Sequence, residues 1–358
     1  MANYLYIRGL KQADYTVFGV ANGQKHYYSP GSNRPQPFSS GQQVKRSILD
    51  ALVDTLDGER RAPITFNYEI AKGGKKNGKD QFSQKEPWNP CDPTYADQLV
   101  GGWMRAQSGQ GTIKRRSPLS ISAMRPLHPS LASMTNDENG TFDRSDRPQD
   151  HKIEVRDSKG NTMDPAEVAE WLRENDRTIP LRNWLQLGPR ASGLFVFDVA
   201  VDLDRMFRIS TNPYDPELSA EMLDKLREQG WTEEDDYIIV PEDRQTEILD
   251  ALAEAIVNWR ITSNQSRTFS PQGTLALAVS KNANRIVNAI RADLKDTLPD
   301  ERQMAEAVID SIDGVDLFVS LAARGSIQDA PGSATAMDDA QQAIRSALEE
   351  ARTSATPV

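Results

Sequence analysis

The stretch that decides the fold is GLFVFDVAVDL, residues 193–203. Apolar side chains occupy every second position from Phe195 to Leu203 and so share one face of an extended chain. A period of two is typical of a strand with one face in a hydrophobic core. We therefore predict a central strand here, and the elements around it define the class of the fold.

The segments on either side of this strand have helical and extended patterns. Apolar positions at helical spacing predict a helix that begins near Gly41 or Gln42 and ends before Gly58, and Ser40 with Gln43 suggests a capping box. After the central strand, the pattern predicts a helix over 244–260 and a strand over 274–279. We also expect strands at 4–10, 15–20, 64–70 and 315–321, helices at 165–174, 217–229 and 282–296, and an Ala-rich acidic helix near the C-terminus.

These elements predict an α+β protein. The order is strand, helix, strand, insertion, strand, helix, strand, which suits a ferredoxin-like or RNA-recognition-type sheet. Residues 1–70 and 191–325 would form this core, and 71–190, which are low in periodicity and rich in Gly, Pro, Asn and Ser, would be inserted into it. Residues 326–358 would form a terminal helix and tail. Such a sheet hosts many functions, so the site must decide the function.

Charge is unevenly distributed along the chain. The 42 Lys and Arg against 52 Asp and Glu give a net charge of −10, which taken alone argues against a nucleic-acid partner. Residues 1–130 hold 18 basic and 10 acidic residues, a charge of +8, whereas residues 131–358 hold 24 and 42, a charge of −18. No acidic residue lies between Asp14 and Asp50. This asymmetry favours a nucleic-acid face in the N-terminal part.

Several classes of chemistry are disfavoured by the composition. A single cysteine, Cys91, cannot form an internal disulfide, and three scattered histidines are too few for a Cys/His zinc site. The sequence lacks a Walker loop, a GxGxxG turn and a GxSxG elbow. It has no apolar run of about 18 residues and no signal-like N-terminus, so we expect a cytoplasmic protein with no membrane partner.

Two weaker candidates for chemistry stay open at this point. His26, beside Tyr27 and Tyr28, could act as an acid or base in RNA cleavage, although a lone loop histidine is usually structural. The acidic run 233–236 could bind a hard cation, although carboxylates in a turn are usually only solvated.

The most informative stretch is SSGQQVKR, residues 39–46. A helix N-terminus presents amide donors and a partial positive charge, which favours phosphate. The hydroxyl groups of the two serines and the Gln42 amide add neutral donors, and Lys45 with Arg46 adds two cations one turn further on. An ordinary capped helix would not explain the acid-free surroundings.

These residues resemble a known family. PFSSGQQVKRSILDAL (37–52) is similar to the Ser-Ser-Gln-x-hydrophobic-Lys-Arg motif of the CRISPR Cascade backbone subunit, the CasC-like or "Cas-seven" branch of the repeat-associated RNA-binding proteins, of type I character. ASGLFVFDVAVDLDRM (191–206) resembles that family's central strand, and NQSRTFSPQGTLALAVS (264–280) resembles its Arg-Thr-aromatic loop and following strand. Gly41 stands where the family often has a second serine.

The resemblance implies a hand-shaped subunit with a palm (1–70 and 191–325), a finger insertion (71–125) and a thumb insertion (126–190). It implies that Ser40, Gln42, Lys45 and Arg46 hold phosphates of a guide RNA, that Met124 stacks against bases and that Arg267 supports the RNA-binding face. It also implies a possible contact with target DNA through four finger lysines: Lys72, Lys75, Lys76 and Lys79.

The function implied is binding, with no catalytic residue, metal or cofactor. RNA-cutting relatives use an Asp before the first helix, and this chain has no acid from 15 to 49, so we expect a separately recruited nuclease to cleave. The expected partners are CRISPR guide RNA, target DNA rather than RNA, other Cascade subunits and further copies of the chain. The alternatives are an RNA-processing endonuclease that uses His26 or Tyr27, and a filament or capsid subunit without nucleic acid.

Overall fold

The structure is a computed structural model of the 358-residue chain. It describes residues 3–19, 24–30, 34–70, 82–106, 111–135, 140–143, 149, 151–185, 188–263, 265, 268–295 and 303–354. The chain divides into two compact units. Unit 1 comprises Met1–Met134 and Ala191–Val358, and unit 2 comprises Thr135–Arg190.

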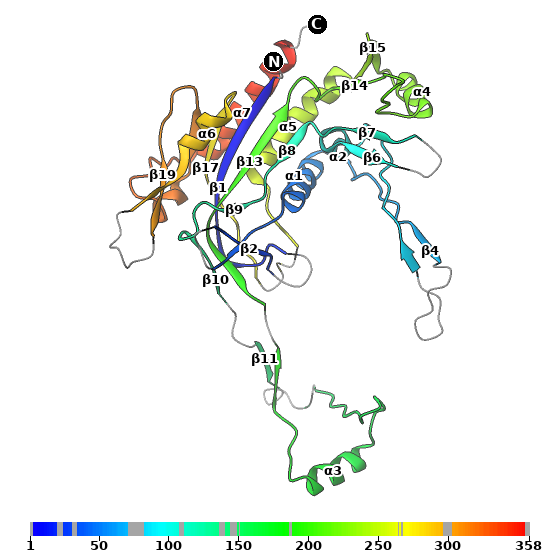
Figure 1. Ribbon diagram of the computed structural model, residues 1–358, viewed down its shortest axis with the longest axis vertical. Helices are drawn as coiled ribbons and strands as arrows, with labels where there is room; N and C mark the ends of the chain where they lie inside the picture. Colours follow the sequence, from blue (N-terminus) through cyan, green and yellow to red (C-terminus); the bar gives the residue numbers. More distant parts are fainter. Residues whose placement is uncertain are drawn as a thin grey trace. The chain divides into compact units, whose positions relative to one another are not determined.

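A seven-stranded sheet forms the centre of unit 1 (Figure 1). Its strands lie in the order β10, β13, β1, β17, β20, and β8 and β9 also pair with β13. The pairs of β13 with β1, β8 and β9, and of β17 with β1 and β20, are antiparallel. The strand bounds are β1 Tyr4–Thr16, β8 Leu119–Ile121, β9 Arg125–Pro126, β10 Ala132–Thr135, β13 Arg190–Asp202, β17 Thr274–Ser280 and β20 Asp316–Val319.

The connections give this sheet a β-α-β-β-α-β order. From β1 the chain passes through α1 (Gly41–Thr55) to β8 and β9, returns in β13, and passes through α5 (Glu242–Asn258) to β17. The two strands that open the halves of this pattern, β1 and β13, are therefore neighbours in the middle of the sheet. The expected α+β class is confirmed, as are the central strand, the helix after Ser40, the helix before Trp259 and the strand after it.

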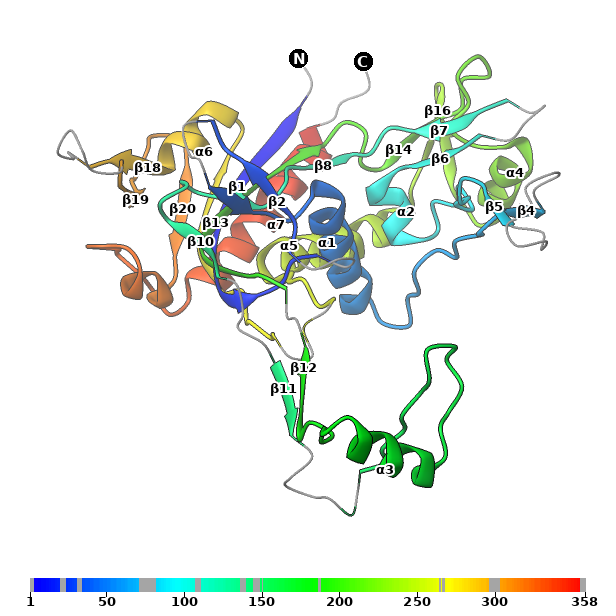
Figure 2. The same cartoon turned by 60° about the horizontal axis from the view of Figure 1, so that its bottom comes forward.

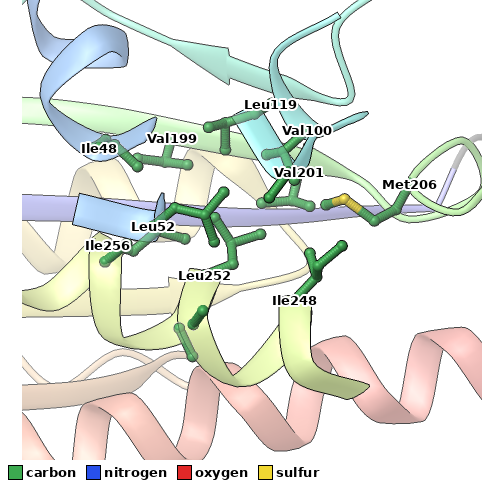
Figure 3. Packing of buried hydrophobic residues seen from close by; sticks show 14 of the residues in the cluster. Ile48, Leu52, Val100, Leu119, Val199, Val201, Met206, Ile248, Leu252 and Ile256 are labelled. Carbon is green, nitrogen blue, oxygen red and sulfur yellow. The ribbon is translucent and has the colours of Figure 1, made fainter. Parts of the chain in front are cut away.

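The two faces of the sheet are covered by different helices. Ile48 and Leu52 of α1 and Leu252 of α5 pack with Val199 and Val201 of β13, all buried (Figure 3). The terminal helix α7 (Ala336–Ser354) packs beside α5 and against β17 and β20. A second cluster lies on the other face under α6 (Ala283–Ala289) and the 3-10 helix Leu321–Gly325. Each of these buried Leu, Ile or Val side chains contributes about 1.5–3 kcal/mol.

Strand β1 is longer than its sequence pattern indicates. It runs without a break from Tyr4 to Thr16, so the predicted interruption at residues 11–14 is wrong. Lys11 remains inside the strand because its buried ammonium donates to the Trp259 and Gln272 carbonyls at 2.9 and 3.1 Å and to Thr274 Oγ1 at 2.9 Å. Two register shifts accompany this strand: one against β17 between Leu10 and Lys11, and one against β13 between residues 13 and 16.

Two other expectations are corrected. The helix predicted over 282–296 ends at Ala289, because β18 (Ile290–Leu294) pairs with β19 (Ala305–Ile309), a partner that helical spacing cannot reveal. The strand predicted over 64–70 is reduced to β4 (Tyr68–Ile70), which pairs with β5 (Phe82–Gln84). Its apolar side chains are exposed, not half-buried.

Shorter elements surround the sheet in unit 1 (Figure 2). A three-stranded sheet in the order β14, β16, β15 packs near helix α4, and several two-stranded hairpins complete the unit. The bounds are β2 His26–Tyr28, β3 Pro35–Pro37, α2 Ala96–Gly101, β6 Trp103–Arg105, β7 Ile113–Arg115, β14 Arg208–Ser210, α4 Ala220–Glu228, β15 Thr232–Glu234 and β16 Tyr237–Ile239.

Unit 2 holds the hairpin of β11 (Gly140–Asp143) with β12 (Arg182–Leu185) and the helix α3 (Pro165–Glu174). The predicted helix at 165–174 is confirmed, and Asp164 caps it, because the Asp164 carboxylate accepts the Ala166 amide at 2.9 Å and the Glu167 carboxylate accepts the Asp164 amide. No residue of α3 is buried. None of the described helices is long and apolar enough to cross a membrane.

Candidate nucleic-acid interface

The first turn of α1 is an open helix N-terminus. Ser40 has the extended N-cap backbone, with φ −65° and ψ 150°, but its side chain makes no capping hydrogen bond. The predicted capping box is therefore wrong, and the Gln43 amide instead reaches Ser263 Oγ at 3.5 Å. The first turn holds no acidic residue. Its amide donors and the positive end of the helix dipole are thus available to an anion.

Glycine at position 41 is explained by a close approach of two chain segments. A Cβ on Gly41 would lie 3.1 Å from the carbonyl oxygen of Ile121 in β8. A Cβ at this position would require that strand to shift by a few tenths of an ångström. Glycine therefore eases the close approach of the first turn of α1 to β8.

A bridge between Ser39 and Met124 anchors the entry to α1. The Ser39 amide donates to the Met124 carbonyl at 2.9 Å, and the Met124 amide donates to the Ser39 carbonyl at 3.0 Å. The Met124 side chain is 1% exposed and belongs to the main core cluster. The Met124 side chain thus lies within the core in this structure, and its stacking against bases stays a prediction. The Ser39 hydroxyl is fully buried and has no hydrogen-bond partner among the described residues.

Lys45 points into the protein. Its Nζ donates to the Gly101 carbonyl at 2.7 Å and to Ser117 Oγ at 2.6 Å, and so connects α1 to the end of α2. Burial lowers the pKa of Lys45 to about 8. Two of its three N–H donors are already used, so Lys45 contributes positive potential near the site and a structural link.

The surface of this helix end is formed by Ser40, Gln42 and Arg46. Ser40 is half-buried and Gln42 is exposed. The Arg46 side chain is 44% exposed and pairs with Asp50 one turn on, at 2.7 Å. A phosphate at the first turn would meet neutral donors first, with the Arg46 guanidinium one turn further along.

The hairpin of β2 and β3 leads directly into this site. The Phe38 amide donates to the Lys25 carbonyl at 3.1 Å, which places the hairpin beside Ser39. Lys25 and Arg34 are exposed and form no ion pair with any residue in the described part of the chain. The His26 ring packs edge-on against Tyr28, with ring centroids 5.9 Å apart, and none of the described carboxylates hydrogen-bonds to it.

Other basic residues divide into two groups. Arg115 is 4% exposed and structural, because its guanidinium donates to the carbonyls of Arg205, Met206 and Arg208. Arg267 and the four lysines Lys72, Lys75, Lys76 and Lys79 lie outside the described residues. The acidic run at 233–236 forms no metal-ligating cluster in the described ranges, and its Glu233 pairs with Arg227 at 2.7 Å.

Sequence reasoning missed the polar framework of the loop between α5 and β17. The Gln265 side chain is buried and donates to the Thr16 hydroxyl and the Val17 carbonyl, both at 2.8 Å. The Gln272 side chain, 1% exposed, both donates to and accepts from the Ile261 backbone. The sequence does show these two glutamines in a stretch that otherwise looks like a loop. A glutamine in a loop is usually exposed, so the sequence alone does not predict that they are buried.

No family model matches the chain, and no curated protein sequence matches it. A structure described as "CRISPR RNA-guided surveillance complex, pre-nicking" has a TM-score of 0.44 and 9% identity, covering 97% of this chain and 89% of that chain. Another, described as "CRISPR RNA-guided surveillance complex", has a TM-score of 0.37 and 10% identity, covering 77% and 68%. The chain is thus similar in structure to chains of such complexes. This similarity identifies no particular subunit and assigns no role to any residue.

Proposed function

We propose that this chain is a guide-RNA-binding backbone subunit of a Cascade-type CRISPR surveillance complex. The observation that carries the proposal is the open N-terminus of α1: the Ser40 side chain does not cap it, its first turn holds no acid, and the sequence around it is acid-free from 15 to 49. Such an end binds phosphate through backbone amides and the helix dipole.

The sheet supports the same proposal. Its β-α-β-β-α-β order, with β1 and β13 side by side in the middle, is that of ferredoxin-like and RNA-recognition-type sheets. In this proposal unit 1 supplies the palm, and unit 2 lies within the proposed thumb. The finger would comprise residues 71–125, although β8 within that range is also a strand of the central sheet.

The proposed mechanism is binding without cleavage. Contacts to phosphate and sugar accept any guide sequence, and base pairing between guide and target supplies the specificity. Several copies of the chain would lie along one guide, together with other subunits, and present it to target DNA. Cleavage is assigned to a separately recruited nuclease, because the stretch before α1 holds no carboxylate to position a metal.

The first experiment tests whether the purified full-length protein carries RNA. We expect an absorbance ratio at 260 and 280 nm above that of protein alone, and sequencing of the extracted RNA should return repeat-derived guides. A preparation with the spectrum of protein alone, which also fails to bind added guide RNA, would contradict the proposal. Defined cleavage of repeat RNA that is lost in His26→Ala would instead favour the processing endonuclease.

The second experiment tests the site. Arg46→Ala should weaken binding of single-stranded RNA and reduce the slope of log K against log salt by about 0.7, the value for one lost phosphate contact. The matched control is Arg345→Ala, since the Arg345 side chain is 50% exposed and also pairs with one aspartate, Asp250, but belongs to α7. Equal slopes for both variants would exclude Arg46 from the interface.

A further inference from the structure

An exposed aromatic ring lies on the loop between α5 and β17, whose Ser263 contacts Gln43 in the first turn of α1. Phe269 is 63% exposed, and the Arg260 guanidinium carbon lies 5.8 Å from the centroid of its ring. Arg260 is exposed and forms no ion pair within the described ranges. An apolar ring with an unneutralised cation over it is an arrangement that binds the π-face of a nucleobase.

The loop holds this ring in place by buried polar contacts. Gln265 accepts the Ser270 amide at 3.2 Å through Oε1 and donates to the Val17 carbonyl at 2.8 Å. Ser270 is 3% exposed, and its hydroxyl accepts the Asp14 amide at 3.2 Å. The residue that follows Phe269 is therefore anchored to β1. A ring that projects from a fixed backbone position loses little freedom when a flat partner stacks on it.

The same loop touches the first turn of α1. The Gln43 amide reaches Ser263 Oγ at 3.5 Å, and Arg260 and Thr262 line a groove with Ser47 of α1. The acidic residues Asp50, Asp54 and Glu254 and the basic Arg61 line the same groove. These carboxylates disfavour a polyanion within the groove itself, so the link between the loop and the first turn of α1 rests on the contact of Gln43 with Ser263.

We propose that Phe269, with Arg260, forms a stacking platform for one unpaired nucleobase of the strand whose phosphates lie at the α1 N-terminus. This inference rests on the proposed function and adds a base contact to it. The platform reads no base identity, because every nucleobase has a π-face. The platform therefore favours a strand that carries unpaired bases over an abasic strand, which has only the sugar-phosphate backbone.

The test compares two single-stranded RNAs of equal length and charge, one of mixed sequence and one with abasic riboses throughout its centre. The full chain should bind the base-bearing RNA more tightly. Phe269→Ala should weaken that binding about 5- to 150-fold, the range for one lost stacking contact, with little change for the abasic RNA. Phe269→Trp should retain the preference, because its ring also stacks. A 2-aminopurine placed in the RNA should lose its quenching in Phe269→Ala only.

The matched control is Tyr214→Ala. Tyr214 is an aromatic residue 95% exposed beside Asp215, so a general effect of removing a surface ring would appear there as well. If Phe269→Ala binds both RNAs as the wild type does, the platform is refuted while the phosphate site stands. If the wild type binds neither RNA, the proposed function and the platform fail together.

Discussion

Replacing Ser40 by aspartate should move stability and RNA binding in opposite directions. Ser40 already has the backbone conformation of an N-cap, but its hydroxyl accepts no hydrogen bond from the first turn. An Asp side chain there can accept the amide of the second or third helical residue and place a negative charge at the positive end of the dipole. It would also occupy the position at which we place a phosphate.

The two effects have different magnitudes. A new cap should add about 0.5–2 kcal/mol to the free energy of unfolding, and the charge at the dipole about 0.3–1 kcal/mol more. A carboxylate roughly 4 Å from a bound phosphate would raise the free energy of binding by about 1–4 kcal/mol, depending on the local dielectric. Since about 1.4 kcal/mol is a factor of ten, the loss of RNA affinity lies between about fivefold and about a thousandfold.

The matched variant is Ser40→Asn, because the asparagine side-chain oxygen can cap α1 without adding a charge. Both variants should raise the urea midpoint of unfolding, and only Ser40→Asp should lose most of its affinity for single-stranded RNA in a titration at fixed salt. Equal losses of RNA affinity in both variants would show that the Ser40 hydroxyl itself is required for binding and that the added charge has no effect. Wild-type affinity in Ser40→Asp, with the stability gain present, would refute phosphate binding at this helix end.

Three further predictions concern stability. Lys45→Ala should lower the free energy of unfolding by about 1–3 kcal/mol, because two partly buried acceptors lose their donor. Arg46→Ala should change the free energy of unfolding by no more than about 0.5 kcal/mol, and urea titrations compare the two variants. Burial lowers the pKa of Lys11 to about 7, so the folded state binds fewer protons than the unfolded state between about pH 7 and 10.5. Stability should therefore rise with pH across that window, by up to about 1.4 kcal/mol per pH unit, and Lys11→Met should flatten this rise when midpoints are measured at several pH values. Gly9→Ala should cost about 1–3 kcal/mol, because the new Cβ would lie 2.2 Å from the buried ring of Phe197; an unchanged thermal midpoint would contradict that packing.

The core elements could be predicted because their periodicity reflects burial on one face. The alternation along β13 and the helical spacing in α1 and α5 match residues that are in fact buried against one another. The expectations that were wrong, such as the break predicted within β1, have a different origin. Lys11 interrupts the apolar pattern of β1, yet three acceptors from distant residues satisfy its ammonium inside the sheet. Local pattern carries no information on acceptors about 250 positions away.

The candidate site was predictable in position but not in the direction of its side chains. The motif at 39–46 does lie at a helix N-terminus, because its serine, glycine and polar residues precede an amphipathic run. Which of its cations face outward depends on neighbours that the motif does not contain. Lys45 turns toward the Gly101 carbonyl on α2, and Arg46, one residue on, remains at the surface. Phe269 lies within a loop that resembles the family's, and only the 63% exposure of its side chain distinguishes it there.

The net charge of −10 and a polyanionic partner are compatible because they act over different distances. Charges more than about 8 Å apart in water are largely screened at physiological salt, so acidic surfaces elsewhere on the chain contribute little at the site. At contact distance the uncapped amides, Arg46 and Arg260 set the potential, and each phosphate bound there releases counterions whatever the total charge. The acidic remainder of the chain then opposes loose, non-specific association with nucleic acid. In the proposed function, binding becomes favourable only where a strand reaches the first turn of α1. On that proposal the position of this turn, and not the net charge of the protein, determines where RNA would lie.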